Sequence, residues 1–200
     1  MDLPKDAHCA IICGKTNCGK TKFALDLLER DYHDVFEHIV ILCPTLRDNS
    51  TYKSRRWIEN DPEVYAILPG DRINDCLKHF HDKFKNESTL FLIDDCSAER
   101  ELSLKRQELS RLAFSGRHTG HSVWILSQKY NSILTDFREQ TRWVAMFKCK
   151  DRDNFDDCLR ENYVIQSKAE REEVRKQLNN HKYSKVILCT DYPSFYRVIL

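Results

Sequence analysis

The chain has 200 residues, of which 41% are hydrophobic and 32% charged, a balance typical of one compact globular domain with its own core. Its 32 Lys and Arg residues offset 31 Asp and Glu residues, and the net charge of +1 excludes a strong overall basic field for nucleic acid. No apolar stretch approaches the roughly 20 residues of a membrane span, so we expect a soluble protein without membrane contacts.

Short apolar runs alternate with longer amphipathic stretches, which is typical of βαβ units. We predict strands at 8–13, 37–43, 64–68, 89–94, 121–127, 142–147, 185–190 and 195–200. We predict helices at 20–30, within 57–69, and at 74–85, 98–114, 151–162 and 167–179. This order favours an α/β fold, with a mainly parallel central sheet and helices on both faces. We expect one domain over 1–200, with a core at about 8–150 and a helical and β subregion at about 151–200.

The nine cysteines are scattered, and none shows the C-x-x-C spacing typical of zinc sites. Several lie inside apolar runs, where a free thiol packs as a small hydrophobic group. With an odd number of cysteines and no signal peptide, we expect an intracellular protein in a reducing compartment.

The first predicted strand leads directly into the pattern G-x-x-x-x-G-K-[ST], the phosphate-binding P-loop or Walker A motif. Its glycines allow a tight turn whose N–H groups point inward, and the following helix adds its positive dipole end. The lysine would neutralise β- and γ-phosphate oxygens, and the final hydroxyl would bind Mg²⁺. We therefore predict that ATP or GTP phosphates bind at Gly14, Lys15, Thr16, Asn17, Cys18, Gly19, Lys20 and Thr21.

Two further predicted strands end in polar residues suited to nucleotide hydrolysis. The run 90–93 ends at Asp94 and Asp95, as a Walker B motif requires. Asp94 would hold Mg²⁺ through water, and Asp95 would polarise the attacking water. Gln128 follows the strand 121–127, where its amide could contact the γ-phosphate or the lytic water.

The order of these motifs resembles the genome-packaging ATPases of large DNA viruses, the poxvirus-type branch of the FtsK/HerA superfamily. The resemblance spans about residues 8–150 and includes the Cys43-Pro44-Thr45 turn and the segment from Gly116 to Ser122 before Gln128. It implies a RecA-like, ring-forming homo-oligomer that hydrolyses ATP with Mg²⁺ and moves double-stranded DNA into a capsid. It also implies capsid or portal-vertex partners, and a location in the host cytoplasm or nucleus during assembly or in the virion.

Such a ring is expected to use an arginine finger from one subunit against the nucleotide of its neighbour. Arg117, Arg138 and Arg142 are the candidates, and the sequence does not choose among them. The local clusters Lys105-Arg106 and Arg111 could contribute DNA contacts when several subunits surround one channel.

Two other classes of function remain open. A small-molecule kinase of the nucleoside type would have a similar length and a P-loop, and the segment Glu99–Arg111 could serve as its lid. It would usually carry paired cysteines for zinc, which this sequence lacks. A nucleotide-dependent switch that binds ATP and barely hydrolyses it is also compatible with the balanced charge. A GTPase is disfavoured because no Asn-Lys-x-Asp tetrapeptide occurs.

Overall fold

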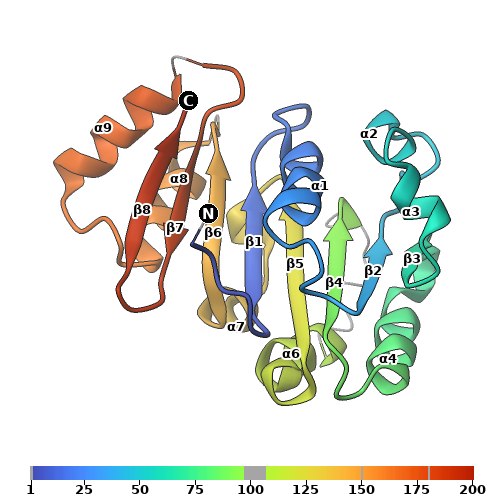
Figure 1. The fold of residues 1–200 in the computed structure, drawn as a ribbon. Helices are drawn as coiled ribbons and strands as arrows, with labels where there is room; N and C mark the ends of the chain where they lie inside the picture. The colour runs from blue at the N-terminus through green and yellow to red at the C-terminus, as the bar shows by residue number, and fades with distance from the viewer. Residues whose placement is uncertain (1, 97–106, 150, 180) are drawn as a thin grey trace.

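The computed structural model describes residues 2–96, 107–149, 151–179 and 181–200. Among these residues, eight strands form one sheet in the order β3-β2-β4-β5-β1-β6-β7-β8 (Figure 1). The strands are β1 (Cys9–Cys13), β2 (His38–Leu42), β3 (Val64–Ile67), β4 (Thr89–Asp94), β5 (His121–Ser127), β6 (Thr141–Phe147), β7 (Lys185–Cys189) and β8 (Phe195–Ile199).

The pairing of the strands confirms a mainly parallel sheet. Each pair from β3 through to β6 is parallel, whereas β7 is antiparallel to β6 and β8 is antiparallel to β7. All eight predicted strands are present, with ends within about one residue of the prediction, the usual uncertainty of assignment. The region after residue 150 extends this same sheet by two strands.

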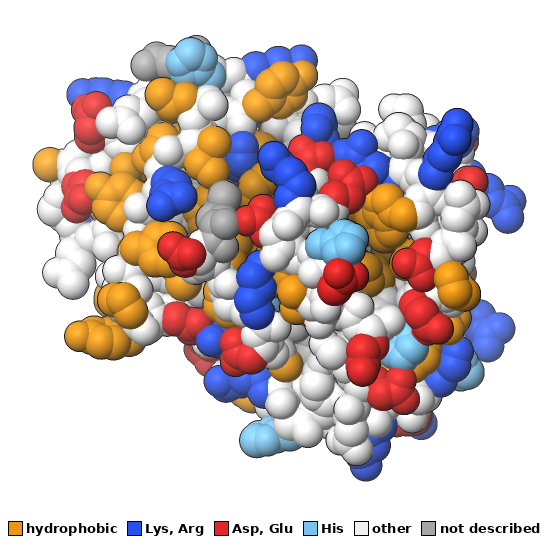
Figure 2. Space-filling model, viewed as in Figure 1, with side chains coloured by type: hydrophobic (Ala, Val, Ile, Leu, Met, Phe, Trp, Pro, Cys, Tyr) orange, Lys and Arg blue, Asp and Glu red, His pale blue; other side chains and the backbone are white. Residues whose placement is uncertain are grey.

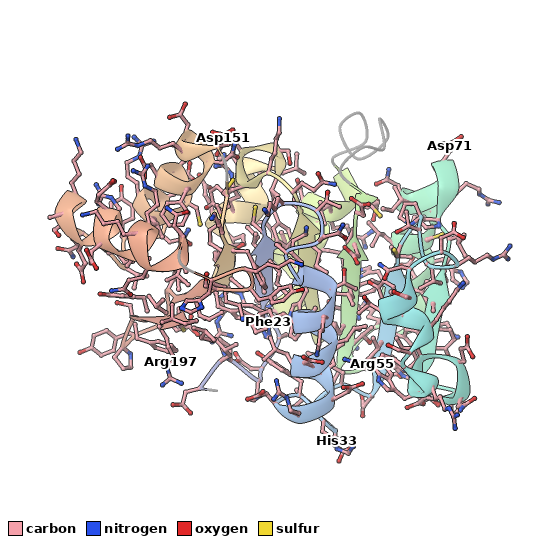
Figure 3. The ribbon with its side chains drawn as sticks, turned by 90° about the horizontal axis from the view of Figure 1, so that it is seen from above. Phe23, His33, Arg55, Asp71, Asp151 and Arg197 are labelled. Atoms are coloured by element: carbon pink, nitrogen blue, oxygen red, sulfur yellow. The ribbon has the colours of Figure 1, made fainter. Side chains whose placement is uncertain are left out.

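Helices cover both faces of the sheet, as predicted. The helices are α1 (Lys20–Arg30), α2 (Ser50–Lys53), α3 (Arg56–Asn60), α4 (Ile73–Lys83), α6 (Gln107–Ser115), α7 (Thr135–Glu139), α8 (Arg152–Glu161) and α9 (Lys168–Asn179). One apolar cluster joins α1 and the segment carrying α2 and α3 to one face. A second joins α4, α6, α7, α8 and α9 to the other face. Seen from above, α1 and α8 lie on opposite sides of the sheet (Figure 3).

The sequence prediction missed α2 and α7. Both are short, and neither has enough length for a hydrophobic period to be recognised. The predicted helix 98–114 is described only from Gln107, because its residues 98–106 lie outside the described residues. No helix in the described part of the chain is long and apolar enough to cross a membrane.

The surface over the middle of the sheet differs from the surface over its C-terminal strands. Charged side chains of both signs gather over α1, whereas hydrophobic side chains gather over the region of β7 and β8 (Figure 2). The exposed large hydrophobic residues between positions 180 and 200 that the structure describes are Tyr183, Tyr192, Tyr196 and Leu200.

Candidate active site

The predicted P-loop joins β1 to α1 at the carboxyl edge of the parallel strands. Its first glycine donates its N–H to the carbonyl of Ser127 at 3.1 Å, which fixes the loop to the end of β5. A Cβ at Gly14 would lie 2.6 Å from Cβ of Phe147 and 2.7 Å from Sγ of Cys18, so only glycine fits there. Gly19 has φ of +96°, a conformation that side chains strongly disfavour. The two glycines are therefore required by the shape of the loop.

Lys20 lies across this loop. Its Nζ donates to the carbonyl oxygens of Gly14 at 2.7 Å and of Lys15 at 3.0 Å. Among the described residues it forms no ion pair with a carboxylate. Its charge is thus held at the mouth of the loop by neutral acceptors, which phosphate oxygens would displace with a gain in charge pairing.

The predicted metal ligands meet although 73 residues separate them. The Thr21 hydroxyl donates to Oδ2 of Asp94 at 2.8 Å. Asp94 is only 3% exposed, and this burial raises the pKa of its carboxyl, while hydrogen bonds from Thr21 and Tyr52 and the charge of Lys20 oppose that rise. A nearby positive charge would therefore stabilise the carboxylate further.

Thr21 and Asp94 fit a magnesium site. Mg²⁺ prefers oxygen ligands and is commonly held by one or two protein oxygens together with substrate phosphates and water. These two side chains supply a hydroxyl and a carboxylate oxygen beside the phosphate loop. In the described ranges, no group of three or more His, Cys, Asp or Glu side chains could hold a metal by itself. A metal at this edge would thus depend on the nucleotide as well.

The predicted catalytic pair is also brought together. Nε2 of Gln128 donates to Oδ1 of Asp95 at 3.2 Å. Because β5 lies between β4 and β1 in the sheet, Gln128 leaves the strand between the Walker B residues and the P-loop. Asp95 has φ of +56°, an uncommon backbone conformation for a residue other than glycine. The amide and the carboxylate therefore stand side by side at the edge where parallel sheets bind ligands.

The three candidate arginines lie away from this cluster. Arg117 follows α6 before the start of β5, at the opposite edge of the sheet, where its guanidinium donates to Oε1 of Gln140 at 3.3 Å. Arg142, near the start of β6, contacts Asp191 and Asp6, each at 2.6 Å. These two carboxylates raise the pKa of the Arg142 guanidinium.

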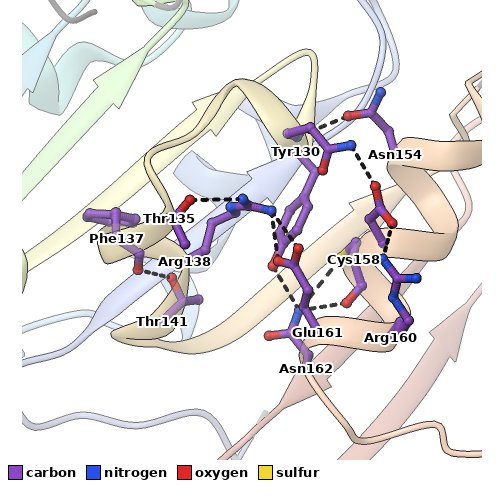
Figure 4. A network of polar contacts seen from close by, with 12 residues as sticks. Tyr130, Thr135, Phe137, Arg138, Thr141, Asn154, Cys158, Arg160, Glu161 and Asn162 are labelled. Atoms are coloured by element: carbon purple, nitrogen blue, oxygen red, sulfur yellow. Dashed lines mark hydrogen bonds and ion pairs between the residues drawn. The ribbon is translucent and has the colours of Figure 1, made fainter.

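Arg138 belongs to a network between α7 and α8 (Figure 4). Its guanidinium pairs with Glu161 at 2.7 Å and lies 5.1 Å from the centre of the Tyr130 ring. Asn162 donates to the Tyr130 hydroxyl at 3.2 Å and so extends this network. Arg138 and Arg142 are thus engaged with carboxylates of their own chain, whereas Arg117 contacts a neutral amide.

Sequence reasoning missed Tyr52 of α2. Its hydroxyl donates to Oδ2 of Asp94 at 2.8 Å, the same oxygen that accepts from Thr21, and the residue is only 3% exposed. Burial, followed by the charge of Asp94, raises the pKa of this phenol well above its usual value. The one available signal was position, because Tyr52 lies shortly after the turn that follows β2.

The fold and the site together define a P-loop nucleoside triphosphatase. The family model described as Poxvirus A32 protein matches residues 2–191, and the chain belongs to that family. This confirms the resemblance to poxvirus-type proteins. A sequence comparison with curated proteins finds no significant match.

Solved structures share the fold at low identity. The chain is similar to the genome packaging NTPase B204 of Sulfolobus turreted icosahedral virus 2 in complex with sulfate, with a TM-score of 0.68, 14% identity and 99% of each chain covered. The AMPPCP complex of B204 gives a TM-score of 0.65 at 12% identity, again over 99% of each chain. The pCW3 conjugation coupling protein TcpA with ATPgS gives 0.63 at 12% identity, over 98% of this chain and 60% of TcpA.

Proposed function

We propose that the protein is an ATP-hydrolysing motor that moves double-stranded viral DNA into a capsid as a homo-oligomeric ring. The observation that carries the catalytic part is the convergence of three chain segments at one edge of the sheet. Thr21 contacts Asp94, Gln128 contacts Asp95, and the loop is fixed to the strand that delivers Gln128. Membership in the poxvirus A32 family and similarity to a genome packaging NTPase support the movement of viral DNA into a capsid as the use of this hydrolysis.

The chain's own residues divide the chemistry among them. The N–H groups of the loop and Lys20 hold the phosphates, while Asp95 and Gln128 orient and polarise the attacking water. Bound Mg²⁺, held by Thr21 and Asp94, would neutralise charge that develops on the phosphates. Nucleotide complexes of B204 with AMPPCP and ATP-gammaS support ATP as the ligand.

Assembly completes the site in this proposal. A near-neutral chain has little positive surface to grip DNA alone, whereas several copies around one channel would add their local charges together. Arg111 is one such residue, and Lys105 and Arg106 lie outside the described residues. Among the finger candidates we rank Arg117 first, because its described partner is a neutral amide that it could leave at little cost.

The proposal places the protein in the infected cell, in the cytoplasm or nucleus during assembly or in the virion, with capsid or portal-vertex proteins as docking partners. Membership in a poxvirus family supports an infected cell. Seven of the nine cysteines are buried, where thiols pack as small hydrophobic groups, and this supports a reducing compartment.

The deciding experiment measures ATP hydrolysis with and without double-stranded DNA over a range of protein concentrations. The motor requires turnover per subunit that rises with DNA and rises more than linearly with protein concentration. A slow turnover that DNA does not change would favour a nucleotide-dependent switch. Phosphate transfer to a nucleoside by a monomer would favour a kinase.

A pair of variants tests the division between the two aspartates. Asp95→Asn should leave Mg·ATP bound and slow hydrolysis by about 10²-fold, because the amide cannot polarise water as a carboxylate does. Asp94→Asn should instead raise the Mg²⁺ concentration needed for nucleotide binding. Equal and mild effects of both variants would refute this assignment.

A further inference from the structure

A hollow of about 840 Å³ opens beside the P-loop. Gly19 and Lys20 line it on the loop side, and Phe147, Tyr183 and Lys185 line it on the side of the C-terminal strands. Its volume is in the range of about 300–1,000 Å³ that ligand sites usually occupy. The loop accounts for the phosphates of a nucleotide, which leaves the other wall without an assigned role.

Tyr183 forms the part of this wall nearest to the loop. A Cβ placed on Gly19 would lie 3.3 Å from Cδ1 of the Tyr183 ring, so the ring packs directly over the glycine. The side chain nevertheless stays 55% exposed. Nζ of Lys182 lies 5.0 Å from the ring centre and adds a positive charge beside it. An aromatic ring is thus held at the P-loop with much of its surface open.

The wall behind Tyr183 is built from aromatic rings and a lysine stem. Phe23 and Phe147 meet edge to face, with ring centres 5.9 Å apart. Nζ of Lys185 lies 5.0 Å from the Phe23 ring and 5.2 Å from the Phe147 ring. Figure 3 shows Phe23 on α1, at the side of the helix toward the C-terminal strands. A Cβ on Gly19 would also lie 3.8 Å from the Phe147 ring, so the exposed Tyr183 ring stands beside this packed wall.

We propose that Tyr183 is the platform on which the nucleobase stacks while the P-loop holds the phosphates. This inference rests on the proposed function, because it extends the same nucleotide site. Stacking on an aromatic ring is favourable for every base, since each base has a π-face. Tyr183 should therefore strengthen the binding of ATP and GTP to a similar extent.

The test compares nucleotides with inorganic tripolyphosphate by calorimetry on the full chain. Tyr183→Ala should weaken ATP and GTP binding by about 10-fold, the order expected for one lost stack, and leave tripolyphosphate binding unchanged. Tyr183→Phe should bind like the wild type, because the ring is retained. Phe114→Ala is a matched control, since Phe114 is 49% exposed and lies in α6, away from the hollow.

The outcomes separate this inference from the function on which it rests. Wild-type protein that binds neither ATP nor tripolyphosphate would refute the nucleotide site as a whole. Wild-type binding of ATP with an unchanged affinity in Tyr183→Ala would refute the platform alone. An equal loss of ATP and tripolyphosphate affinity would also refute it, because the substitution would then act on the loop.

A separate observation concerns Asp94. One of its oxygens accepts hydrogen bonds from both Thr21 and Tyr52, each at 2.8 Å, inside a buried environment. Tyr52 belongs to α2, which is capped by Asn49 through the N–H of Thr51. Asn49 and Thr51 themselves line the hollow beside the loop. The Tyr52 hydroxyl thus links α2, and the residues that line the hollow beside it, to the carboxylate of Asp94.

We propose that Tyr52 is a positioning residue for Mg²⁺, acting by fixing the orientation of the Asp94 carboxylate. A ligand carboxylate that is itself hydrogen-bonded binds its metal better, and loss of such a partner typically weakens metal binding or activity by about 10–100-fold. This inference also rests on the proposed nucleotide site, but not on the role of Tyr183.

The test is a Mg²⁺ titration of nucleotide binding, followed with a fluorescent ATP analogue. Tyr52→Phe should raise the Mg²⁺ concentration at half-saturation by about 10-fold and leave binding in EDTA unchanged. Tyr32→Phe is the matched control. Tyr32 is 2% exposed, and its hydroxyl donates to the Pro4 carbonyl at 2.8 Å; it lies just beyond the C-terminal end of α1, whereas Thr21 is at the start of that helix.

Both variants remove one buried hydroxyl, so a purely structural effect would be the same in each. An unchanged Mg²⁺ dependence in Tyr52→Phe would overturn the proposal. An equal shift in Tyr32→Phe would overturn it as well. If the nucleotide affinity of the wild-type protein does not change with Mg²⁺ concentration, the metal site itself is refuted.

Discussion

The two edges of the central sheet hold their polar side chains in different ways. At the amino edge, the polar groups are paired with one another: Arg142 contacts two carboxylates, and His121 lies 2.9 Å from His81. At the carboxyl edge, the described partners of Lys20 are backbone carbonyls, and the Gln128–Asp95 pair is exposed.

This difference separates polar groups that stabilise the fold from polar groups that remain available to a ligand. Ion-paired or buried groups at the amino edge, such as Arg142 and His121, are satisfied inside the chain, so their removal should change the free energy of unfolding. Groups at the carboxyl edge are held in place but not neutralised, so their removal should change ligand binding and turnover. Variants at the two edges can therefore be compared directly.

The largest effect is expected from Lys20→Ala. The phosphates lose the cation that the loop holds at its mouth, so ATP affinity should fall by about 10³-fold or more, because several charge-assisted contacts are lost at once. The melting temperature should stay within about 2 °C, because Lys20 forms no ion pair with a carboxylate in the described part of the chain.

Lys78→Ala is the control for this change, since it removes the same charge from an exposed position of α4. Calorimetric titration with ATP measures both variants. Unchanged affinity in Lys20→Ala would show that the loop does not bind phosphates.

At the amino edge, His8 should make stability depend on pH. Its Nε2 accepts from the Trp124 indole at 2.9 Å, and burial lowers the pKa of His8 from 6.5 to about 4. In the unfolded chain His8 is protonated below about pH 6.5, whereas in the folded chain it stays neutral until the pH approaches 4. Stability should therefore be complete above pH 6.5 and fall by up to about 3 kcal/mol as the pH decreases toward 4.

Denaturant unfolding followed by tryptophan fluorescence at several pH values measures this decrease. His8→Gln keeps an acceptor for Trp124 without the titration, so its stability should vary less between pH 6.5 and 4. A variant with the same pH profile as the wild type would assign the dependence to other groups, such as His81 and His121, whose pKa values burial also lowers.

Arg142→Met should lower the free energy of unfolding by about 2 kcal/mol, because the carboxylates of Asp6 and Asp191 lose a partly buried partner. Its ATP affinity should be that of the wild type. Arg117→Met, at the same edge but with one neutral partner, should change stability by less than about 0.5 kcal/mol. Similar losses in the two variants would contradict the importance of the paired carboxylates.

The contrast between the edges also marks what the sequence could predict. The strands, the loop and the residues at strand ends follow from local patterns, and so the ligands at the carboxyl edge could be named. The contact of His8 with Trp124 joins residues 116 apart and depends on the register of two strands. Tyr52 reaches Asp94 from a four-residue helix that has no recognisable period. Such contacts depend on tertiary packing, which a single sequence does not reveal.

The smallest effect is expected from Gln128→Ala. Gln128 follows Ser127, whose carbonyl holds the first glycine of the loop, and its amide donates to Asp95. Loss of this neutral contact should leave ATP affinity within about 2-fold and lower DNA-stimulated turnover by about 10-fold, because Asp95 would no longer be oriented toward the attacking water.

The matched control is Gln177→Ala in α9, where the amide donates to Oε1 of Glu173 at a similar distance of 3.4 Å. That variant loses the same chemical group and one hydrogen bond, so it should keep wild-type turnover. Steady-state hydrolysis and ATP titration of both variants then isolate the effect of the amide at the carboxyl edge. Equal turnover in both variants would mean that Gln128 serves the packing of the sheet edge, and Asp95 would then have to act without a partner.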